Sequence, residues 1–266
     1  LDAGESVYDY FTYTVSDGSE NDTAELKITS IGAGNTAPVA RNDVGVISED
    51  STLTVSDGDN ANETGDSGTT YNATGEHSGD VINTSSTTHY DTDAEGDTIV
   101  VSSVRTGSVE GSGTAGTLGQ ALTGTYGQLT LNSNGSYTYV ANQTAADALD
   151  AGDTEDDVFN YTISDGNGGT DIGTITITVI GINDAPVAQD DVGVIAEGST
   201  LTVANSANAN VSGSYDATGE HSGDVIDTSS SSHTDSDADA SSSLSITHVK
   251  LSGGSNSTVA SSSSYN

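Results

Sequence analysis

Short runs of this sequence alternate strictly between apolar and polar residues. The apolar positions of these runs are Phe11, Tyr13 and Val15, Leu129 and Leu131, Tyr137 and Tyr139, Phe159, Tyr161 and Ile163, and Ile175, Ile177 and Val179. A period of two over residues rich in Thr, Val, Ile and Tyr is typical of β-strands with one buried face. The pattern predicts strands over residues 44–47, 52–55, 99–104, 128–131, 136–140, 158–163 and 174–180.

The segments between these runs are rich in turn-forming residues. Asn134–Gly135 separates two alternating runs and predicts a hairpin, because Asn-Gly tolerates the positive φ angles of tight turns. Helical periodicity is confined to residues 144–151, which are long enough for only a turn or two. The sequence therefore predicts an all-β protein built from immunoglobulin-like β-sandwiches.

Parts of the sequence occur twice. The decapeptide ATGEHSGDVI stands at 73–82 and again at 217–226, residues 37–55 match 185–203, and residues 1–18 match 149–166. Such repetition is typical of arrays in which one structural unit recurs along the chain. We predict tandem sandwich repeats of about 148 residues: the C-terminal part of a preceding repeat at 1–36, one complete repeat at 37–184 and the N-terminal part of a following repeat at 185–266.

The charge of the chain excludes some partners and favours others. The chain has forty acidic residues and only four basic ones, which gives a net charge of −36. Nucleic acid and anionic membrane surfaces are therefore not expected as partners. Carboxylates at this density repel one another unless cations neutralise them, and oxygen ligands suit Ca²⁺. Composition alone also fits a disordered chain, but the alternating runs argue against it.

The sequence offers little for catalysis or membrane insertion. Cysteine is absent, which excludes disulfides, zinc-thiolate sites and thiol nucleophiles. No apolar run approaches the roughly 20 residues that span a bilayer. Neither a nucleophile elbow, nor a zinc-protease motif, nor a phosphate loop is present, so we expect no enzymatic activity.

Closely spaced carboxylates are the candidate calcium ligands. They alternate along one loop and recur in part 144 residues later: Asp91, Asp93, Glu95 and Asp97, and then Asp235, Asp237 and Asp239. Loops of this kind can converge several oxygens on one Ca²⁺, although a solvated acidic turn is the alternative. A third acidic loop at 165–171 begins with Asp165 and equally fits a plain β-turn.

The junctions between repeats carry further oxygen donors. Asn183 and Asp184 stand where one repeat ends, and Asp191 and Glu197 follow in the next. Carboxylates from both sides of a junction can share Ca²⁺ and stiffen the joint. At the earlier junction Thr36 replaces the aspartate, which predicts weaker binding there.

Two histidines occur again 144 residues later. His77 and His89 correspond to His221 and His233. A transition-metal site is one interpretation, and packing or hydrogen bonding within the repeated loop is the other.

Together, several segments resemble the VCBS repeat. The resemblance is carried by residues 124–139, 149–152, 159–170, 175–179 and 183–186. That family belongs to the bacterial cadherin-like domains of very large secreted, RTX-type adhesins. The resemblance implies a calcium-stiffened array outside the cell or at the bacterial surface, serving adhesion, surface display or biofilm matrix. By position it implies the calcium ligands Asp91, Asp93, Asp97, Asp165, Asp184, Asp191 and Glu197.

The leading hypothesis is a non-catalytic structural repeat whose partners are the neighbouring repeats of the same array. One alternative is a carbohydrate-binding module that recognises surface glycans through Tyr71, Tyr90 or Tyr126. Another is a filament subunit, in which other copies of the chain complete the open second repeat by strand exchange.

Overall fold

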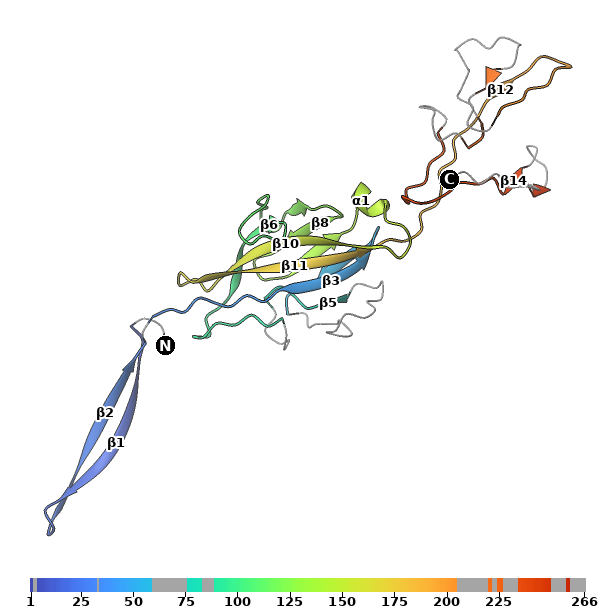
Figure 1. Ribbon diagram of the computed structural model, residues 1–266. Coiled ribbons are helices and arrows are strands. Elements are labelled where there is room, and N and C mark those ends of the chain that lie inside the picture. The colour runs from blue at the N-terminus through green and yellow to red at the C-terminus, as the bar shows by residue number, and fades with distance from the viewer. Residues whose placement is uncertain are drawn as a thin grey trace. The chain divides into compact units, whose positions relative to one another are not determined.

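The chain forms two compact units of β-structure. The computed structural model describes residues 1, 4–32, 34–58, 76–82, 89–204, 220–221, 224–226, 234–249 and 257–258 (Figure 1). Residues 1–143 and 155–179 make up the first unit, and residues 144–154 and 180–266 the second. The predicted division into one complete repeat and two partial ones stays a prediction.

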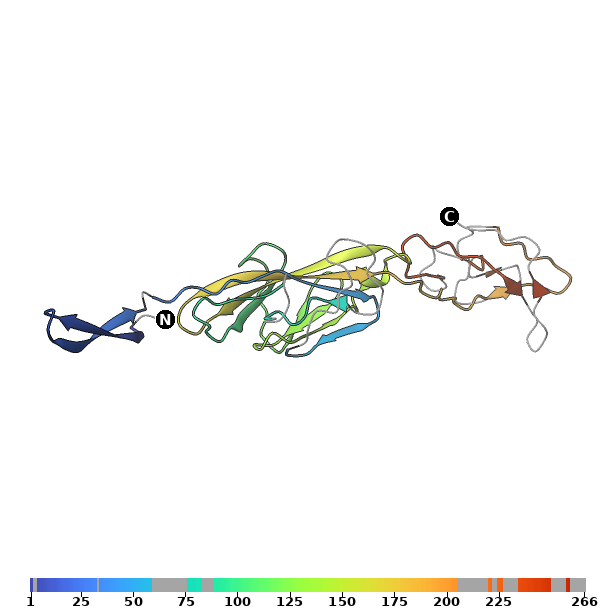
Figure 2. The same cartoon turned by 90° about the horizontal axis from the view of Figure 1, so that it is seen from below.

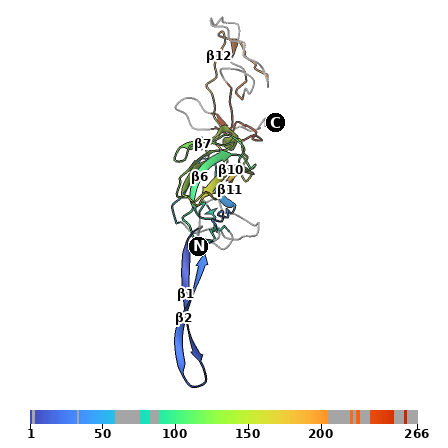
Figure 3. The ribbon, with the colours of Figure 1, turned by 90° about the vertical axis from the view of Figure 1, so that its left-hand side faces the viewer.

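Two sheets form the sandwich of the first unit. One has five strands in the order β5-β3-β11-β10-β6, and the other four in the order β4-β9-β8-β7. The five are β5 (Glu76–His77), β3 (Asp43–Ser48), β11 (Thr170–Ile180), β10 (Thr154–Ser164) and β6 (Val100–Thr106), and the four are β4 (Thr52–Val55), β9 (Tyr137–Val140), β8 (Gln128–Leu131) and β7 (Ala121–Thr123). Figure 2 shows the two layers, and Figure 3 shows β6, β10 and β11 side by side.

The alternating residues supply the core between the sheets. Phe159, Tyr161 and Ile163 of β10 are fully buried, as are Tyr137 and Tyr139 of the opposite sheet. The rings of Tyr139 and Phe159 pack edge to face, with centroids 6.3 Å apart. Burial of these rings stabilises the sandwich together with burial of aliphatic side chains such as Leu129, Ile175 and Ile177.

The remaining elements are short or stand apart from the sandwich sheets. β1 (Ser6–Ser16) and β2 (Asn21–Ile31) form a separate antiparallel hairpin. In the second unit β12 (Gly193–Val194) pairs with β13 (Glu220–His221), and β14 (His248–Val249) pairs with β15 (Ser257–Thr258). The helix α1 (Thr144–Asp147) is a single turn, as its length in the sequence predicts.

The structure confirms the all-β sandwich and the strands expected within it. The predicted hairpin forms between β8 and β9, with Gly135 at φ 91°. β10 and β11 are longer at their starts than predicted, beginning at Thr154 and Thr170. β5 and β7 were not predicted, because two or three residues are too few to show a period of two.

Candidate metal centre

The loop before β6 brings two of its carboxylates together. Asp93 Oδ1 accepts hydrogen bonds from the N–H groups of Glu95, at 2.9 Å, and Asp97, at 3.1 Å. This side-chain turn closes the loop on itself and leaves Asp93 and Asp97 half-buried. These hydrogen bonds therefore fix the direction of the Asp93 side chain.

The turn between β10 and β11 supplies the third carboxylate. Asp165 is buried, and its Oδ1 accepts hydrogen bonds from the N–H groups of Asn167, at 2.8 Å, and Gly169, at 3.0 Å. Asn167 also donates from its side chain to Asp97 Oδ2 at 2.8 Å, which links the two loops. The long, regular strands β10 and β11 hold this turn in place.

The segment before β3 closes over the same loops. Asn35 Nδ2 donates to Asp165 Oδ2 at 2.7 Å, and this hydrogen bond is the largest cause of the lowered pKa of Asp165. Thr36 donates to Glu95 through its N–H, at 3.1 Å, and its hydroxyl, at 3.0 Å. Asn35 and Thr36 thus tie the linker, which is the segment between β2 and β3, to the acidic loops of the sandwich.

The result is a cluster of three carboxylates. One ligand oxygen each from Asp93, Asp97 and Asp165 lies within 4.8 Å of the others. Asp93 Oδ2 is buried without a hydrogen-bond partner in the described residues, and so is the amide oxygen Oδ1 of Asn35. Unpartnered buried acceptors are costly and call for a donor or a cation. Three carboxylates and one amide oxygen are a ligand set that suits Ca²⁺.

Asp91 lies two residues before the cluster and is buried. Its Oδ1 accepts a hydrogen bond from the Arg41 N–H at 2.6 Å, and its Oδ2 has no partner among the residues that the structure describes. Burial, reinforced by the charges of Asp171 and Asp80, raises the pKa of Asp91 to about 7. Asp91 is therefore placed to hold the linker through Arg41.

A second buried acid lies close to the linker. Tyr161 Oη donates to Asp43 Oδ2 at 2.6 Å, and Ser78 Oγ donates to Asp43 Oδ1 at 3.1 Å. Burial raises the pKa of Asp43 well above its usual range, and the hydrogen bonds from Tyr161 and Ser78 offset only part of this rise. Both oxygens of Asp43 have protein partners, so its role is to join β3 to β10 and to the residue that follows β5.

The predicted ligands of the second unit lie in contacts that resemble those of the first. Gln189 N–H donates to Asp235 Oδ1 at 2.7 Å, and Asp239 N–H donates to Asp237 Oδ1 at 3.0 Å. Asp184 N–H donates to Asp239 Oδ2 at 2.9 Å. Asn183 donates to the carbonyl of Asp184, Asp191 is half-buried and Glu197 is exposed. In the described parts of the second unit no three of these carboxylates converge as in the first, and their ligand role stays a prediction.

The histidines lie apart from the acidic cluster. His77 is buried in β5, where its Nδ1 accepts a hydrogen bond from the Gly79 N–H at 3.1 Å. His89 Nδ1 contacts the carbonyl of Asn42. His221 lies in β13, and His233 falls outside the described residues. Hydrogen bonding within the repeated loop accounts for His77, and the metal role of the four stays a prediction.

Three residues of the site were not among the predicted ligands. Asn35, Thr36 and Asn167 are uncharged, so a search for carboxylates passes over them. A signal for Asn35 existed, because it stands at the repeat position of Asn183, which was predicted.

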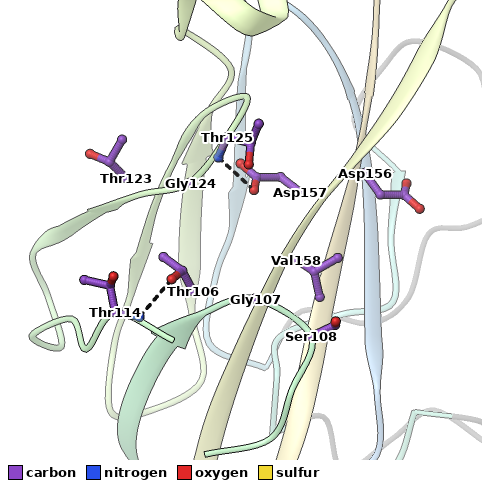
Figure 4. A pocket seen from close by; sticks show the side chains of 10 residues that line it. All are labelled: Thr106, Gly107, Ser108, Thr114, Thr123, Gly124, Thr125, Asp156, Asp157 and Val158. Carbon is purple, nitrogen blue, oxygen red and sulfur yellow. Dashed lines mark hydrogen bonds between the residues drawn. The ribbon is translucent and has the colours of Figure 1, made fainter. Parts of the chain in front are cut away.

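A separate cavity of about 520 Å³ lies between β6, β7 and β10 (Figure 4). Asp157 lies at its edge, where its oxygens accept hydrogen bonds from the N–H groups of Thr125, Tyr126 and Gly127 and from Tyr139 Oη. Four donors satisfy this carboxylate, which therefore anchors the 124–127 loop.

Nothing in the described part of the chain is a helix of the length and apolarity that crossing a membrane requires.

Part of the chain is similar to known proteins. The model of the bacterial cadherin-like domain family matches residues 58–181, which contain all three carboxylates of the cluster. A curated relative, the calcium-binding lectin RapA2 of Rhizobium johnstonii, is 37% identical over 67 residues. The match covers 25% of this chain and 28% of that relative, so the chain spans little more than a quarter of the relative's length. Over residues 58–181, this chain resembles the bacterial cadherin-like domain family.

Proposed function

We propose that the chain is a calcium-binding, non-catalytic segment of an extracellular bacterial adhesin. Its sandwiches would act as spacers for adhesion or surface display, and calcium would stiffen the joints between them. The observation that carries the proposal is the cluster of Asp93, Asp97 and Asp165, beside the unpartnered Oδ1 of Asn35. The cadherin-like family and a relative named as a calcium-binding lectin support it.

The role proposed for each residue follows from its contacts. Asp93, Asp97 and Asp165 would bind Ca²⁺ directly, and Asn35 would add its amide oxygen. Glu95 would hold the linker through Thr36. Calcium at this cluster would therefore link the segment before β3 to both acidic loops, which is the physical basis of a stiffened joint.

Calcium titration of the chelated chain tests the proposal. We expect heat of binding by calorimetry, with a dissociation constant in the range of about 10⁻⁴–10⁻³ M that is common for extracellular modules. Hydrogen exchange should slow at the N–H groups of Glu95, Asp97 and Asn167, because the loops that contain them become ordered.

The matched variants are Asp93→Asn and Glu110→Gln. Each removes one negative charge, but Glu110 is exposed and lies outside the cluster. Asp93→Asn should weaken binding and Glu110→Gln should leave it unchanged. Equal binding by both variants, or none by the wild type, would refute the proposed site.

Carbohydrate binding is a second candidate, favoured by the lectin name of the relative and by the cavity of Figure 4. Hydroxyls of Thr106, Ser108, Thr114, Thr123 and Thr125 line this cavity together with Asp156. Glycan-array binding that Ser108→Ala and Asp156→Asn abolish would support this candidate, and an array without signal would reject it.

A further inference from the structure

The turn between β10 and β11 contains an Asn-Gly pair in an open position. Asn167 and Gly168 are both exposed, and Gly168 has φ 107°. A Cβ built on Gly168 would meet no atom within 4 Å outside the neighbouring residues. In such a pair the backbone nitrogen of glycine can approach the amide carbon of asparagine, because glycine has no side chain to hinder it. The pair is therefore a candidate for a reaction between its two residues.

The side chain of Asn167 points at the acidic cluster. Its Nδ2 donates to Asp97 Oδ2 at 2.8 Å, and its backbone N–H donates to Asp165 Oδ1 at 2.8 Å. A hydrogen bond from the Gly168 N–H also contributes to the lowered pKa of Asp165. A carboxylate that accepts from this N–H raises the electron density on the nitrogen, which favours attack on a carbonyl carbon. Any change at the amide of Asn167 takes place beside two carboxylates of the cluster.

The chain has one other Asn-Gly pair, in the turn between β8 and β9, and there both groups are held. Gly135 is buried, and its N–H donates to the carbonyl of Asn132 at 3.1 Å. Asn134 Oδ1 accepts a hydrogen bond from Ser136 Oγ at 2.8 Å. A Cβ on Gly135 would lie 3.0 Å from the backbone nitrogen of Ile82, so little space surrounds this glycine. The two pairs share a sequence and differ in their surroundings.

We propose that Asn167 is a site of spontaneous deamidation, and that the product adds a fourth carboxylate to the cluster of Asp93, Asp97 and Asp165. The reaction needs water and no other partner. It changes the charge and the hydrogen-bonding capacity of the turn without an enzyme.

The reaction proceeds through a five-membered succinimide ring. The backbone nitrogen of Gly168 forms a bond to Cγ of Asn167 and loses its proton to solvent. The Cγ–Nδ2 bond breaks, Nδ2 takes up a proton from solvent, and ammonia leaves. Water then opens the ring at Cγ to give aspartate, or at the backbone carbonyl carbon to give isoaspartate. The net change is the exchange of ammonia for water, with no oxidation or reduction.

The product reverses the interaction between residue 167 and Asp97. The amide of Asn167 donates to Asp97, whereas a carboxylate can only accept. Without a cation the new charge would repel Asp97 and weaken the link between the two loops. With calcium it would supply a further ligand oxygen and a further negative charge, both of which strengthen binding. The gain in calcium affinity rests on the proposed calcium function, whereas the deamidation does not.

The two Asn-Gly pairs allow a test within one molecule. The full chain is aged in mildly alkaline buffer with EGTA, and the rates are followed by mass spectrometry of chymotryptic peptides, which cleavage after Tyr137 and Tyr161 separates. Asn167 should react faster than Asn134 by about tenfold or more, because the Gly135 nitrogen must first lose a hydrogen bond in a buried turn. Equal rates, a faster rate at Asn134, or no reaction at Asn167 would overturn the proposal.

Unfolding is the control for the effect of structure. In guanidinium chloride the rates at Asn134 and Asn167 should converge, because both residues then react as flexible Asn-Gly pairs. A difference that persists in the unfolded chain would overturn the role assigned to the two turns.

Two variants test the consequence for the cluster. Asn167→Asp should bind calcium about tenfold more tightly than fresh wild type, because ligand charge tunes the affinity of oxygen sites. Ageing should move the affinity of the wild type in the same direction. Asn167→Gln keeps the amide but cannot readily close a five-membered ring, so its affinity should not change on ageing. Equal or weaker binding by Asn167→Asp would overturn the fourth ligand.

Calcium during ageing separates this inference from the proposed function. Calcium should slow the reaction at Asn167 and leave Asn134 unaffected, because order in the acidic loops restricts the approach of Gly168 to the amide. A rate at Asn167 that is the same in calcium and in EGTA would overturn the coupling to the cluster. If no variant bound calcium while Asn167 still reacted faster than Asn134, the calcium function would fail and the deamidation site would stand.

Discussion

Replacement of Asp97 by asparagine should change stability in opposite directions with and without calcium. Asn keeps the size of the side chain and an acceptor for the amide of Asn167, but it removes one charge from the cluster. Without calcium, the charge of Asp97 repels the other two carboxylates of the cluster. With calcium, the same charge strengthens binding of the ion.

The distances in the cluster set the size of the effect. Two unit charges 4.8 Å apart repel by about 1 kcal/mol in water and about 3 kcal/mol at an effective dielectric constant of 20. Asp93 and Asp97 are half-buried, so the lower part of this range applies to the pair. In EGTA, Asp97→Asn should therefore stabilise the fold by about 1–2 kcal/mol, a rise of a few degrees in Tm.

Calcium should reverse the sign of the effect that Asp97→Asn has on stability. A ligand present at 100 times its dissociation constant stabilises the folded state by about 2.7 kcal/mol. Asp97→Asn weakens binding, so it forfeits much of this gain and should unfold at a lower temperature than the wild type in millimolar calcium. Circular dichroism melts of both proteins, with calcium and with EGTA, measure the reversal.

Glu110→Gln is the control for net charge, because Glu110 is exposed and is not one of the three clustered carboxylates. It should shift Tm little and by the same amount in both buffers. If Asp97→Asn moved Tm in one direction in both buffers, or behaved like Glu110→Gln, the cluster would not be a calcium site.

Three further changes test the sandwich itself. Asp157→Asn should destabilise the sandwich by about 1.5–3 kcal/mol, because it weakens the charge-assisted hydrogen bonds that Asp157 accepts from the 124–127 loop. Urea unfolding should show the same loss in calcium and in EGTA. A loss that depends on calcium would contradict this role. Gly127→Ala should lower the free energy of unfolding by about 1–3 kcal/mol in the same assay, because a Cβ there would lie 2.4 Å from Cζ of Tyr139. An unchanged free energy of unfolding would show that the loop can move. In EGTA, Asp91 should make stability fall as pH rises from about 4 to 7, because its pKa is raised to about 7 on folding and the folded state binds more protons in that window. Asp91→Asn should flatten the slope of urea midpoints against pH, and an unchanged slope would refute this.

The core was predictable from the sequence because period-two alternation reports burial directly. Phe159, Tyr161 and Ile163 are buried as their spacing predicts. The same alternation at Phe11, Tyr13 and Val15 correctly indicates a strand, but these residues are exposed. Alternation shows which face of a strand is apolar, and not whether a partner covers that face.

The site was predictable only in part. The spacing of Asp93 and Asp97 shows that one loop can present two carboxylates. Their meeting with Asp165 depends on how the β10–β11 turn lies against a loop about 70 residues earlier, which no local pattern encodes. Asn35 reaches the cluster from still further away, and an amide gives no charge signal in the sequence.

The repeated decapeptide is copied more faithfully than the acidic loops, and the contacts of its described residues give a reason. Its residues Glu76, His77, Ser78 and Asp80 are all buried. Ser78 Oγ donates to Asp43 and accepts from the Val44 N–H at 3.0 Å, while Asp80 accepts from the N–H groups of Gly58 and Ile82. A buried polar network of this kind tolerates few substitutions, because each change leaves a donor or acceptor without a partner. An acidic loop needs only carboxylate oxygens to bind a cation. Asp239 stands at the repeat position of Glu95 and accepts a hydrogen bond from the N–H of Asp184, just as Glu95 accepts one from the N–H of Thr36. The fidelity of the decapeptide is therefore explained by the packing of β5 against β3, and variation in the acidic loops is compatible with a preserved cation site.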